Sequence, residues 1–344
     1  MVLVKNNIGI PFYEPGYIPV KDQIREKSVD YTNPKKIYEY LCGEVYKQDG
    51  YCKDAAMILY NHARGITSRN IVCGPAGCGK TLVWQCLKKI WPRILFVDSS
   101  TLTKTGWKGN NNISDFLTRV DAKHPDYIIV FDEFDKCVAS QTNSGGENVS
   151  TALQSEFLKI VEGAEIPVKI DACERMVDTS RMSFVFCGSF ALKAEEIGKE
   201  NSSSGFGFGM ERHEEKAFAR ELTMQDVISY GVIPELASRT TRIINVRPLT
   251  EEDYQYLITK HSASPIKKLE QTYGMKLRFS KKKIEEIARN AYESGLGIRS
   301  VTAQLMQIMD HKIFESFEDD TETAEVKNHR QKNHKDKKGE RYVL

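Results

Sequence analysis

A glycine-rich octapeptide constrains this chain more than any other feature. Residues 74–81 read Gly-Pro-Ala-Gly-Cys-Gly-Lys-Thr, the full G-x-x-x-x-G-K-[ST] pattern, between the apolar run 70–73 and a helical stretch. The glycines let backbone N–H groups turn inward around phosphates, the lysine reaches the β- and γ-phosphates, and a helix N-terminus adds a favourable dipole. We therefore predict a nucleotide-binding loop made of Gly74, Pro75, Ala76, Gly77, Cys78, Gly79, Lys80 and Thr81.

A second motif is acidic and supplies the carboxylates that a nucleotide-hydrolysing site needs. The apolar run 127–131 has the length of a buried strand and is followed by Asp132 and Glu133. Asp132 is expected to hold Mg²⁺ together with the Thr81 hydroxyl, and Glu133 to polarise the attacking water. Taken alone, the acids could be solvated carboxylates at the end of a strand. Paired with the phosphate loop, they predict an ATPase that uses ATP and Mg²⁺.

Strand-like and helix-like segments alternate over the first two thirds of the chain, which predicts an α/β fold with a parallel sheet flanked by helices. Parallel sheets bind ligands at the carboxyl ends of their strands, where both motifs lie. The expected helices are 34–46 and 52–63, and the expected strands are 70–73, 94–97, 127–131, 183–187 and 243–246.

The pattern changes after Val246. Residues 250–253 have the form of a helix capping sequence, and the rest is helical to about Phe317, with one apolar face made of Ile298, Val301, Leu305, Ile308 and Met309. We expect four parts: an N-terminal extension (1–33), a large ATPase domain (34–246), a small helical domain (247–317) and a charged tail without stable structure (318–344).

Composition excludes several other classes. The net charge is only +2, so it gives no global argument for nucleic acid or membrane binding. No apolar run approaches the roughly 20 residues of a membrane span, and the N-terminus lacks a secretory signal pattern. The eight cysteines form no C-x-x-C pair of the kind that binds zinc. A cytoplasmic protein without membrane contact is expected.

In its motifs the chain resembles the AAA+ unfoldases, the ClpX type most of all. The likeness spans roughly 34–317. It implies a P-loop large domain followed by a small helical lid, ATP hydrolysis, and a chaperone activity that unfolds polypeptides. The segments that carry it, in chain order, are 98–109, 132–136, 158–163, 231–236 and 295–300.

The resemblance implies further site residues. Arg239 takes the place of the arginine finger that reaches the γ-phosphate of a neighbouring subunit, which implies a homohexameric ring. Arg299 takes the place of the second sensor, and Ser189 that of the first. The positions that enclose the adenine correspond to Val45, Tyr46 and Leu249, although Tyr46 and Lys47 replace the usual Ile-Gly.

The resemblance also implies two loops, one that contacts the polypeptide client and one that docks a peptidase partner. Trp107 and Lys108, between two glycines, match the pore loop that grips polypeptide, although Lys108 replaces a small apolar residue. The peptidase-docking loop corresponds to Phe206, Gly207 and Phe208, where Phe206 replaces isoleucine. A ClpP-like peptidase is therefore an open partner assignment.

Three functions remain open at this stage. The first is an ATP-driven protein unfoldase with polypeptide clients. The second is a nucleic-acid remodelling AAA+ ATPase, such as a loader or a helicase-like factor, for which Lys108 and the basic tail are the hints. The third is a nucleotide-gated scaffold that hydrolyses poorly, against which the set of Asp132, Glu133 and Arg239 argues.

Overall fold

The computed structural model describes residues 4–5, 11–12, 29–103, 111–139, 149–170, 173–191, 193–194, 196, 220–262, 264–273 and 277–326. The chain divides into two compact units. One covers Arg25–Pro248, and the other comprises Leu249–Leu344 with Met1–Ile24. The division falls two residues after the change of pattern at Val246.

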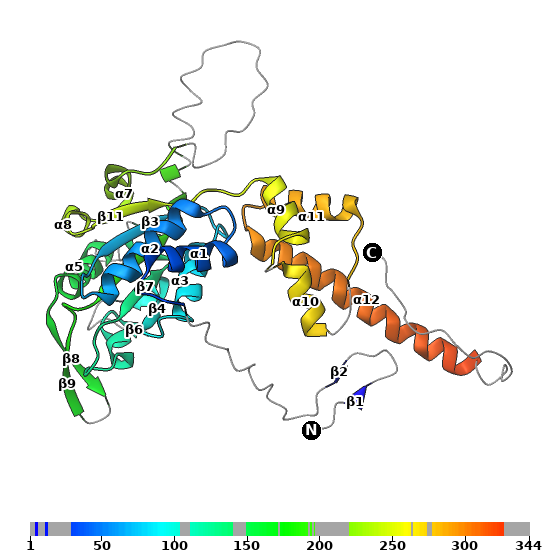
Figure 1. Cartoon of the computed structure of the whole chain (residues 1–344), viewed down its shortest axis with the longest axis horizontal. Helices are drawn as coiled ribbons and strands as arrows, with labels where there is room; N and C mark the ends of the chain where they lie inside the picture. Colours follow the sequence, from blue (N-terminus) through cyan, green and yellow to red (C-terminus); the bar gives the residue numbers. More distant parts are fainter. Residues whose placement is uncertain are drawn as a thin grey trace, which may run out of the picture. The chain divides into compact units, whose positions relative to one another are not determined.

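A five-stranded parallel sheet forms the centre of the larger unit (Figure 1). The strand order is β11-β3-β10-β7-β4, so β3, which leads into the phosphate loop, lies between two neighbours. The prediction of a parallel α/β sheet is confirmed. Its strands are β3 (Arg69–Cys73), β4 (Ile94–Asp98), β7 (Ile128–Asp132), β10 (Ser183–Gly188) and β11 (Arg242–Asn245).

Side chains of the central strands are buried on both faces of the sheet. In β10, Phe184 and Phe186 belong to one apolar cluster, and Val185 and Cys187 belong to the other. Phe131 of β7 stacks on Phe186 with ring centroids 5.4 Å apart. Burial on both faces explains why these strands are continuously apolar in sequence rather than alternating.

Helices cover each face. The first cluster takes residues from α5 (Val149–Val161), α7 (Met224–Tyr230) and α8 (Pro234–Ser238), and α4 (Phe134–Val138) follows β7 on the same face. The second cluster takes residues from α1 (Pro34–Glu44), α2 (Asp49–Ala63) and α3 (Lys80–Lys88). The short elements between β4 and β7 are η1 (Ser99–Thr101), β5 (Leu102–Thr103), β6 (Asn111–Asn112) and η2 (Asp115–Arg119).

An antiparallel hairpin, β8 (Glu165–Ile170) with β9 (Cys173–Asp178), projects from the large unit in Figure 1 and was not expected from the sequence. At its base, Gly163 has a φ of 89° and packs against Ser180, where a Cβ would lie 2.9 Å from the Ser180 Cα. Arg175 donates to the Val120 carbonyl at 2.6 Å. These contacts tie the hairpin to the large unit.

The smaller unit is helical. Thr250 and Asp253 form a capping box at the start of α9, which confirms the capping sequence. Val301, Leu305 and Met309 of the expected apolar face are buried. Its helices are α9 (Glu251–Thr259), α10 (Pro265–Tyr273), α11 (Lys281–Glu293) and α12 (Ile298–Val326).

Two features lie at the ends of the chain. α12 continues past Phe317 to Val326, so the first residues of the segment expected to be an unstructured tail are helical. Near the N-terminus, β1 (Val4–Lys5) pairs with β2 (Pro11–Phe12).

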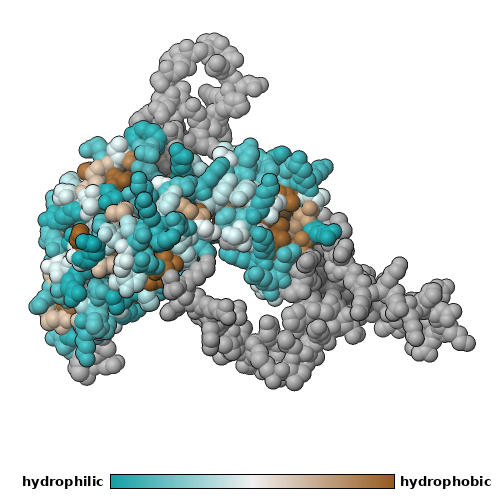
Figure 2. Space-filling view, in the orientation of Figure 1, coloured by the Kyte–Doolittle hydropathy of each residue, from teal (hydrophilic) through white to brown (hydrophobic). Residues whose placement is uncertain are grey.

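The visible surface of the described residues is mostly hydrophilic, with small separate hydrophobic patches (Figure 2). None of the described helices combines the length and the apolar character that crossing a membrane requires.

Buried His62 predicts a pH dependence of stability. Its ring lies 2.9 Å from the Ser183 hydroxyl and 3.1 Å from the Asp126 carbonyl. Burial lowers its pKa below the ordinary 6.5, with Arg93 and Arg181 adding to the shift and Asp126 opposing it. The unfolded chain therefore binds more protons below about pH 6.5, and the free energy of unfolding falls as the pH drops from 6.5 towards the folded pKa, by at most ~1.4 kcal/mol per pH unit.

Denaturant titrations between pH 5 and 8 test this expectation. The variant His62→Gln should flatten the slope below pH 6.5, whereas His124→Gln, at an exposed histidine, should leave it unchanged. An unaltered slope in His62→Gln would show that other groups carry the pH dependence.

Candidate nucleotide-binding and hydrolysis site

The phosphate loop runs from the carboxyl end of β3 to the first turn of α3. Gly74, Gly77 and Gly79 all have positive φ angles, and a Cβ at Gly74 would lie 2.8 Å from the Val246 carbonyl oxygen. Glycine is thus required at Gly74 by both backbone conformation and close packing. The Lys80 ammonium group donates to the carbonyls of Gly74 at 2.7 Å and Pro75 at 2.8 Å. Lys80 therefore points back over the loop.

Asp132 of the acidic motif meets the loop at the carboxyl edge of the sheet. The Thr81 hydroxyl donates to Asp132 Oδ2 at 2.8 Å. The other oxygen of Asp132 accepts the backbone N–H of Glu133 at 3.0 Å. A hydroxyl and a carboxylate at this distance are hard oxygen ligands of the kind that Mg²⁺ prefers, so the residues present fit that ion.

Glu133 sits in an unusual backbone conformation. Its φ is 55°, in the left-handed region, at the start of α4. Its carboxylate pairs with the Lys136 ammonium at 2.5 Å, and this hydrogen bond is the main cause that raises the pKa of Lys136. Strained residues of this type are found at functional sites. Lys136 was not among the expected site residues.

Ser189 directly follows β10 at the position expected for the first sensor. Its hydroxyl donates to Asp135 Oδ2 at 2.7 Å. Asp135 belongs to α4, one turn after Asp132, and is buried. The bond thus links the end of β10 to the segment that carries Asp132 and Glu133.

The expected adenine side is only partly assembled within the large unit. Val45 is buried, and its Cγ1 would lie 3.8 Å from a Cβ at Gly79. Tyr46 is half-buried, and the Lys47 ammonium lies 5.7 Å from its ring centroid. Leu249, the third expected residue, is buried in the other unit.

Two residues that the sequence analysis did not single out contact the phosphate loop, Tyr51 of α2 and Gln48 at the N-cap of that helix. The buried Tyr51 hydroxyl donates to the Lys80 carbonyl at 2.6 Å. The Gln48 amide contacts the Cys78 carbonyl at 3.3 Å. Burial raises the pKa of the Cys78 thiol. Burial thus favours the thiol of Cys78 over the thiolate, which is the reactive form.

Arg239 caps the C-terminal end of α8, on the surface of the large unit. It forms an ion pair with Glu162, and its Nη1 donates to the Glu235 carbonyl at 2.8 Å. Its side chain is 39% exposed. None of the described contacts of Arg239 reaches the phosphate loop of the same chain.

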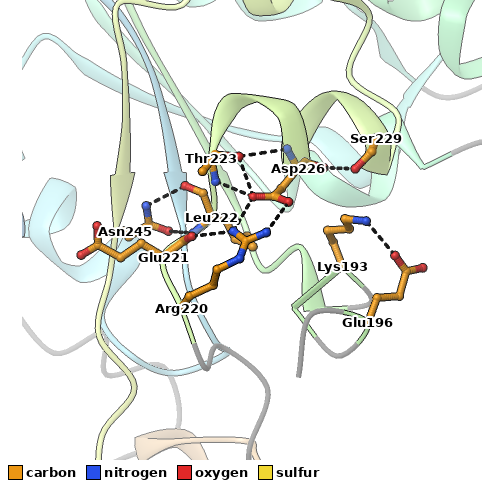
Figure 3. Close-up of polar contacts among 9 residues, drawn as sticks. All are labelled: Lys193, Glu196, Arg220, Glu221, Leu222, Thr223, Asp226, Ser229 and Asn245. Atoms are coloured by element: carbon orange, nitrogen blue, oxygen red, sulfur yellow. Dashed lines mark hydrogen bonds and ion pairs between the residues drawn. The ribbon is translucent and has the colours of Figure 1, made fainter. Parts of the chain in front are cut away.

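A polar network joins the start of α7 to the residues before it and to β11 (Figure 3). Arg220 donates to both oxygens of Asp226 at 2.7 and 2.8 Å, and Thr223 completes a capping box with Asp226 at the start of α7. The Arg220 bond is the main cause that lowers the pKa of Asp226. The Asn245 amide pairs with the Leu222 backbone at 3.0 Å in both directions, which joins this segment to β11.

The remaining expected residues are not part of this assembly. Arg299 is exposed in the first turn of α12, in the smaller unit. The pore-loop pair Trp107 and Lys108 lies outside the described residues, as do the docking-loop residues Phe206, Gly207 and Phe208.

Comparisons with known proteins also indicate an ATPase. Residues 70–188 match the family described as ATPase family associated with various cellular activities (AAA). The chain is 26% identical over 332 residues to the ATP-dependent Clp protease ATP-binding subunit ClpX of Treponema denticola, covering 85% of this chain and 79% of that protein. The ClpX of Porphyromonas gingivalis is 27% identical (84% and 79%), and ClpX 2 of Wolinella succinogenes is 28% identical (82% and 77%).

The matched segment, residues 70–188, contains the phosphate loop, the acidic motif and strand β10. All three belong to the five-stranded parallel sheet or to the loops at its edge. Residues 70–188 form an ATPase domain of the AAA type, which supports nucleotide binding and ATP hydrolysis. Over more than four fifths of its length the chain is ClpX-like, and the identity of 26–28% makes this a divergent likeness.

Proposed function

We propose that this protein is an ATP-dependent protein unfoldase of the ClpX type that works as a homohexameric ring and threads polypeptide through a central pore. The observation that carries the proposal is the meeting of Thr81 with Asp132 at 2.8 Å, beside Glu133, in a chain that matches ClpX subunits over more than four fifths of its length. A ClpP-like peptidase is proposed as its partner because the relatives are named as subunits of the Clp protease.

Each residue of the large-unit site has a proposed role. The loop N–H groups and Lys80 bind the phosphates of ATP, and Lys80 must leave the Gly74 and Pro75 carbonyls to do so. Thr81 and Asp132 hold Mg²⁺, which neutralises phosphate oxygens when bound. Glu133 polarises the attacking water. It first has to loosen its ion pair with Lys136, and exposed pairs of this kind are worth only about 0–1 kcal/mol.

The other expected residues have proposed roles as well. Arg239 acts as the trans finger, and its single-chain partners leave guanidinium N–H groups free for a phosphate. Val45, Tyr46 and Leu249 enclose the adenine, and Arg299 senses the nucleotide from the helical unit. Trp107 grips the client. Phe206 and Phe208 dock the peptidase.

The ATPase rate in the presence of different polymers tests the unfoldase proposal against its alternative. We expect an unfolded protein to stimulate hydrolysis and DNA or RNA to leave it unchanged. Stimulation by nucleic acid alone would instead favour a nucleic-acid remodeller.

A pore-loop variant tests how hydrolysis is coupled to unfolding. Trp107→Ala should keep ATP binding and ring assembly yet fail to unfold a tagged reporter protein, because the grip on the client is lost. Lys108→Val should preserve pulling on polypeptide, whereas a nucleic-acid translocase would lose a phosphate contact.

The control separates a grip residue from a core residue. Trp84 is fully buried, so Trp84→Ala should cost about 3–5 kcal/mol of unfolding free energy, a loss that Trp107→Ala should not show. Normal reporter unfolding by Trp107→Ala would overturn the role of Trp107.

A further inference from the structure

A buried glutamine joins three separate parts of the large unit. Gln48 is 3% exposed. Its Nε2 donates to the Arg247 carbonyl at 2.9 Å and to the Cys78 carbonyl at 3.3 Å, while its Oε1 accepts the Arg247 N–H at 3.1 Å. Both donors of the amide are therefore used, and both polar groups of the Arg247 backbone are held by one side chain.

The contact with Cys78 bears on the phosphate loop because a peptide unit is planar and trans. Its C=O and the following N–H point in opposite directions. When Gln48 holds the Cys78 carbonyl on one side, the Gly79 N–H must face the other. Gly79 has a φ of 102°, which leaves this peptide free to adopt that orientation.

The segment 246–247 also contacts the start of the same loop. The Val246 N–H donates to the Cys73 carbonyl at 2.7 Å, and Gly74 is packed so tightly against Val246 that it has no room for a Cβ. Val246 thus contacts the loop where it begins, and Gln48 connects Arg247 to the loop where it ends. The chain passes into the smaller unit two residues later, at Leu249.

The local structure around Gln48 is unfavourable by itself, and its side chain is not used to cap α2. It occupies the N-cap of α2, yet its side chain makes no capping bond, and glutamine is not a favoured capping residue. The preceding Lys47 has a φ of 54°, a left-handed conformation that is unfavourable for a non-glycine residue. The hydrogen bonds from the Gln48 amide to Cys78 and Arg247 would offset the free-energy cost of the strained Lys47 backbone and of the missing capping bond.

We propose that Gln48 is a positioning residue: it orients the Cys78–Gly79 peptide of the phosphate loop and links that loop energetically to the Arg247 backbone, through which the chain leaves the large unit. The inference rests on the proposed nucleotide site. Binding of nucleotide should therefore tighten the Arg247 N–H bond, and removing the Gln48 amide should weaken nucleotide binding.

Amide hydrogen exchange with a non-hydrolysable ATP analogue tests this link. In the wild-type chain, the analogue should slow exchange both in the phosphate loop and in the peptide that contains Arg247. In Gln48→Met, which keeps the side-chain length without the amide, the loop should still respond while the Arg247 peptide no longer does. The analogue Kd should rise about 3- to 10-fold, as expected for one lost hydrogen-bonding group, and kcat at saturating ATP should change less than about twofold.

Gln154→Met is the matched control. Gln154 is also buried and also bonds to the backbone in both directions, donating to the Gly231 carbonyl at 2.9 Å and accepting the Ile233 N–H at 2.8 Å. Its loss should cost comparable stability but leave the response of the Arg247 peptide intact.

The outcomes separate the two proposals. A wild-type Arg247 peptide that ignores the analogue overturns the role of Gln48, and this result does not depend on whether Gln48→Met folds. An unchanged Kd and an unchanged response in Gln48→Met do the same. A wild-type chain that fails to bind the analogue at all overturns the nucleotide site and the coupling together.

Discussion

Glu133→Gln should lower kcat for ATP by about 10²–10⁴-fold, the range that general-base catalysis supplies, and leave the affinity for an ATP analogue within about twofold. The proposed magnesium ligands are untouched, because Asp132 bonds to the Thr81 hydroxyl and to the backbone N–H of residue 133 rather than to the carboxylate of Glu133. Steady-state ATPase assays and titration with a fluorescent ATP analogue measure the two quantities.

The control makes the same chemical change outside the site. Glu293 is exposed near the end of α11, and Glu293→Gln should leave both kcat and affinity unaltered. If Glu133→Gln turned over ATP at a near-normal rate, another group would have to activate the water. If it lost nucleotide affinity instead, Glu133 would belong to the binding set.

Arg239→Ala should reduce kcat by about 10³–10⁵-fold, the effect of trans-acting arginines in other phosphoryl-transfer enzymes. The ion pair with Glu162 does not prevent this role, since exposed pairs contribute about 0.2–1 kcal/mol, far less than such a finger supplies. Mixing Arg239→Ala chains with Glu133→Gln chains should restore part of the activity, because one interface then combines an intact Glu133 with a neighbour's intact Arg239.

The ATPase rate of the mixture, measured beside mass determination of the mixed assemblies, decides the question. Arg242→Ala serves as control, because Arg242 is also paired, to Asp54 at 2.8 Å, and is equally exposed at 38%. A mixture that stays inactive although mixed hexamers form would exclude Arg239 as a trans finger. A chain that remains monomeric with ATP would remove the basis for the ring.

Much of the fold can be predicted because its signals are local. The strand-sized apolar runs and the Thr250 capping box depend on residues close together in sequence, and both were found where expected. The hairpin β8–β9 was missed, since its strands mix charged and apolar residues and are stabilised by pairing with each other and by Arg175.

The sequence by itself determined the phosphate loop, the acids at the end of β7 and their meeting, because parallel strands end at one edge of a sheet and bring Thr81 to Asp132. Only the tertiary structure decided the partners of the site residues. Lys136 forms an ion pair with Glu133, and Glu162 forms one with Arg239. The Gln48 amide bonds to the carbonyls of Cys78 and Arg247. A glutamine that bonds to a backbone 199 positions away leaves no periodicity or spacing in the sequence, because the contact exists only once the sheet has brought the two segments together.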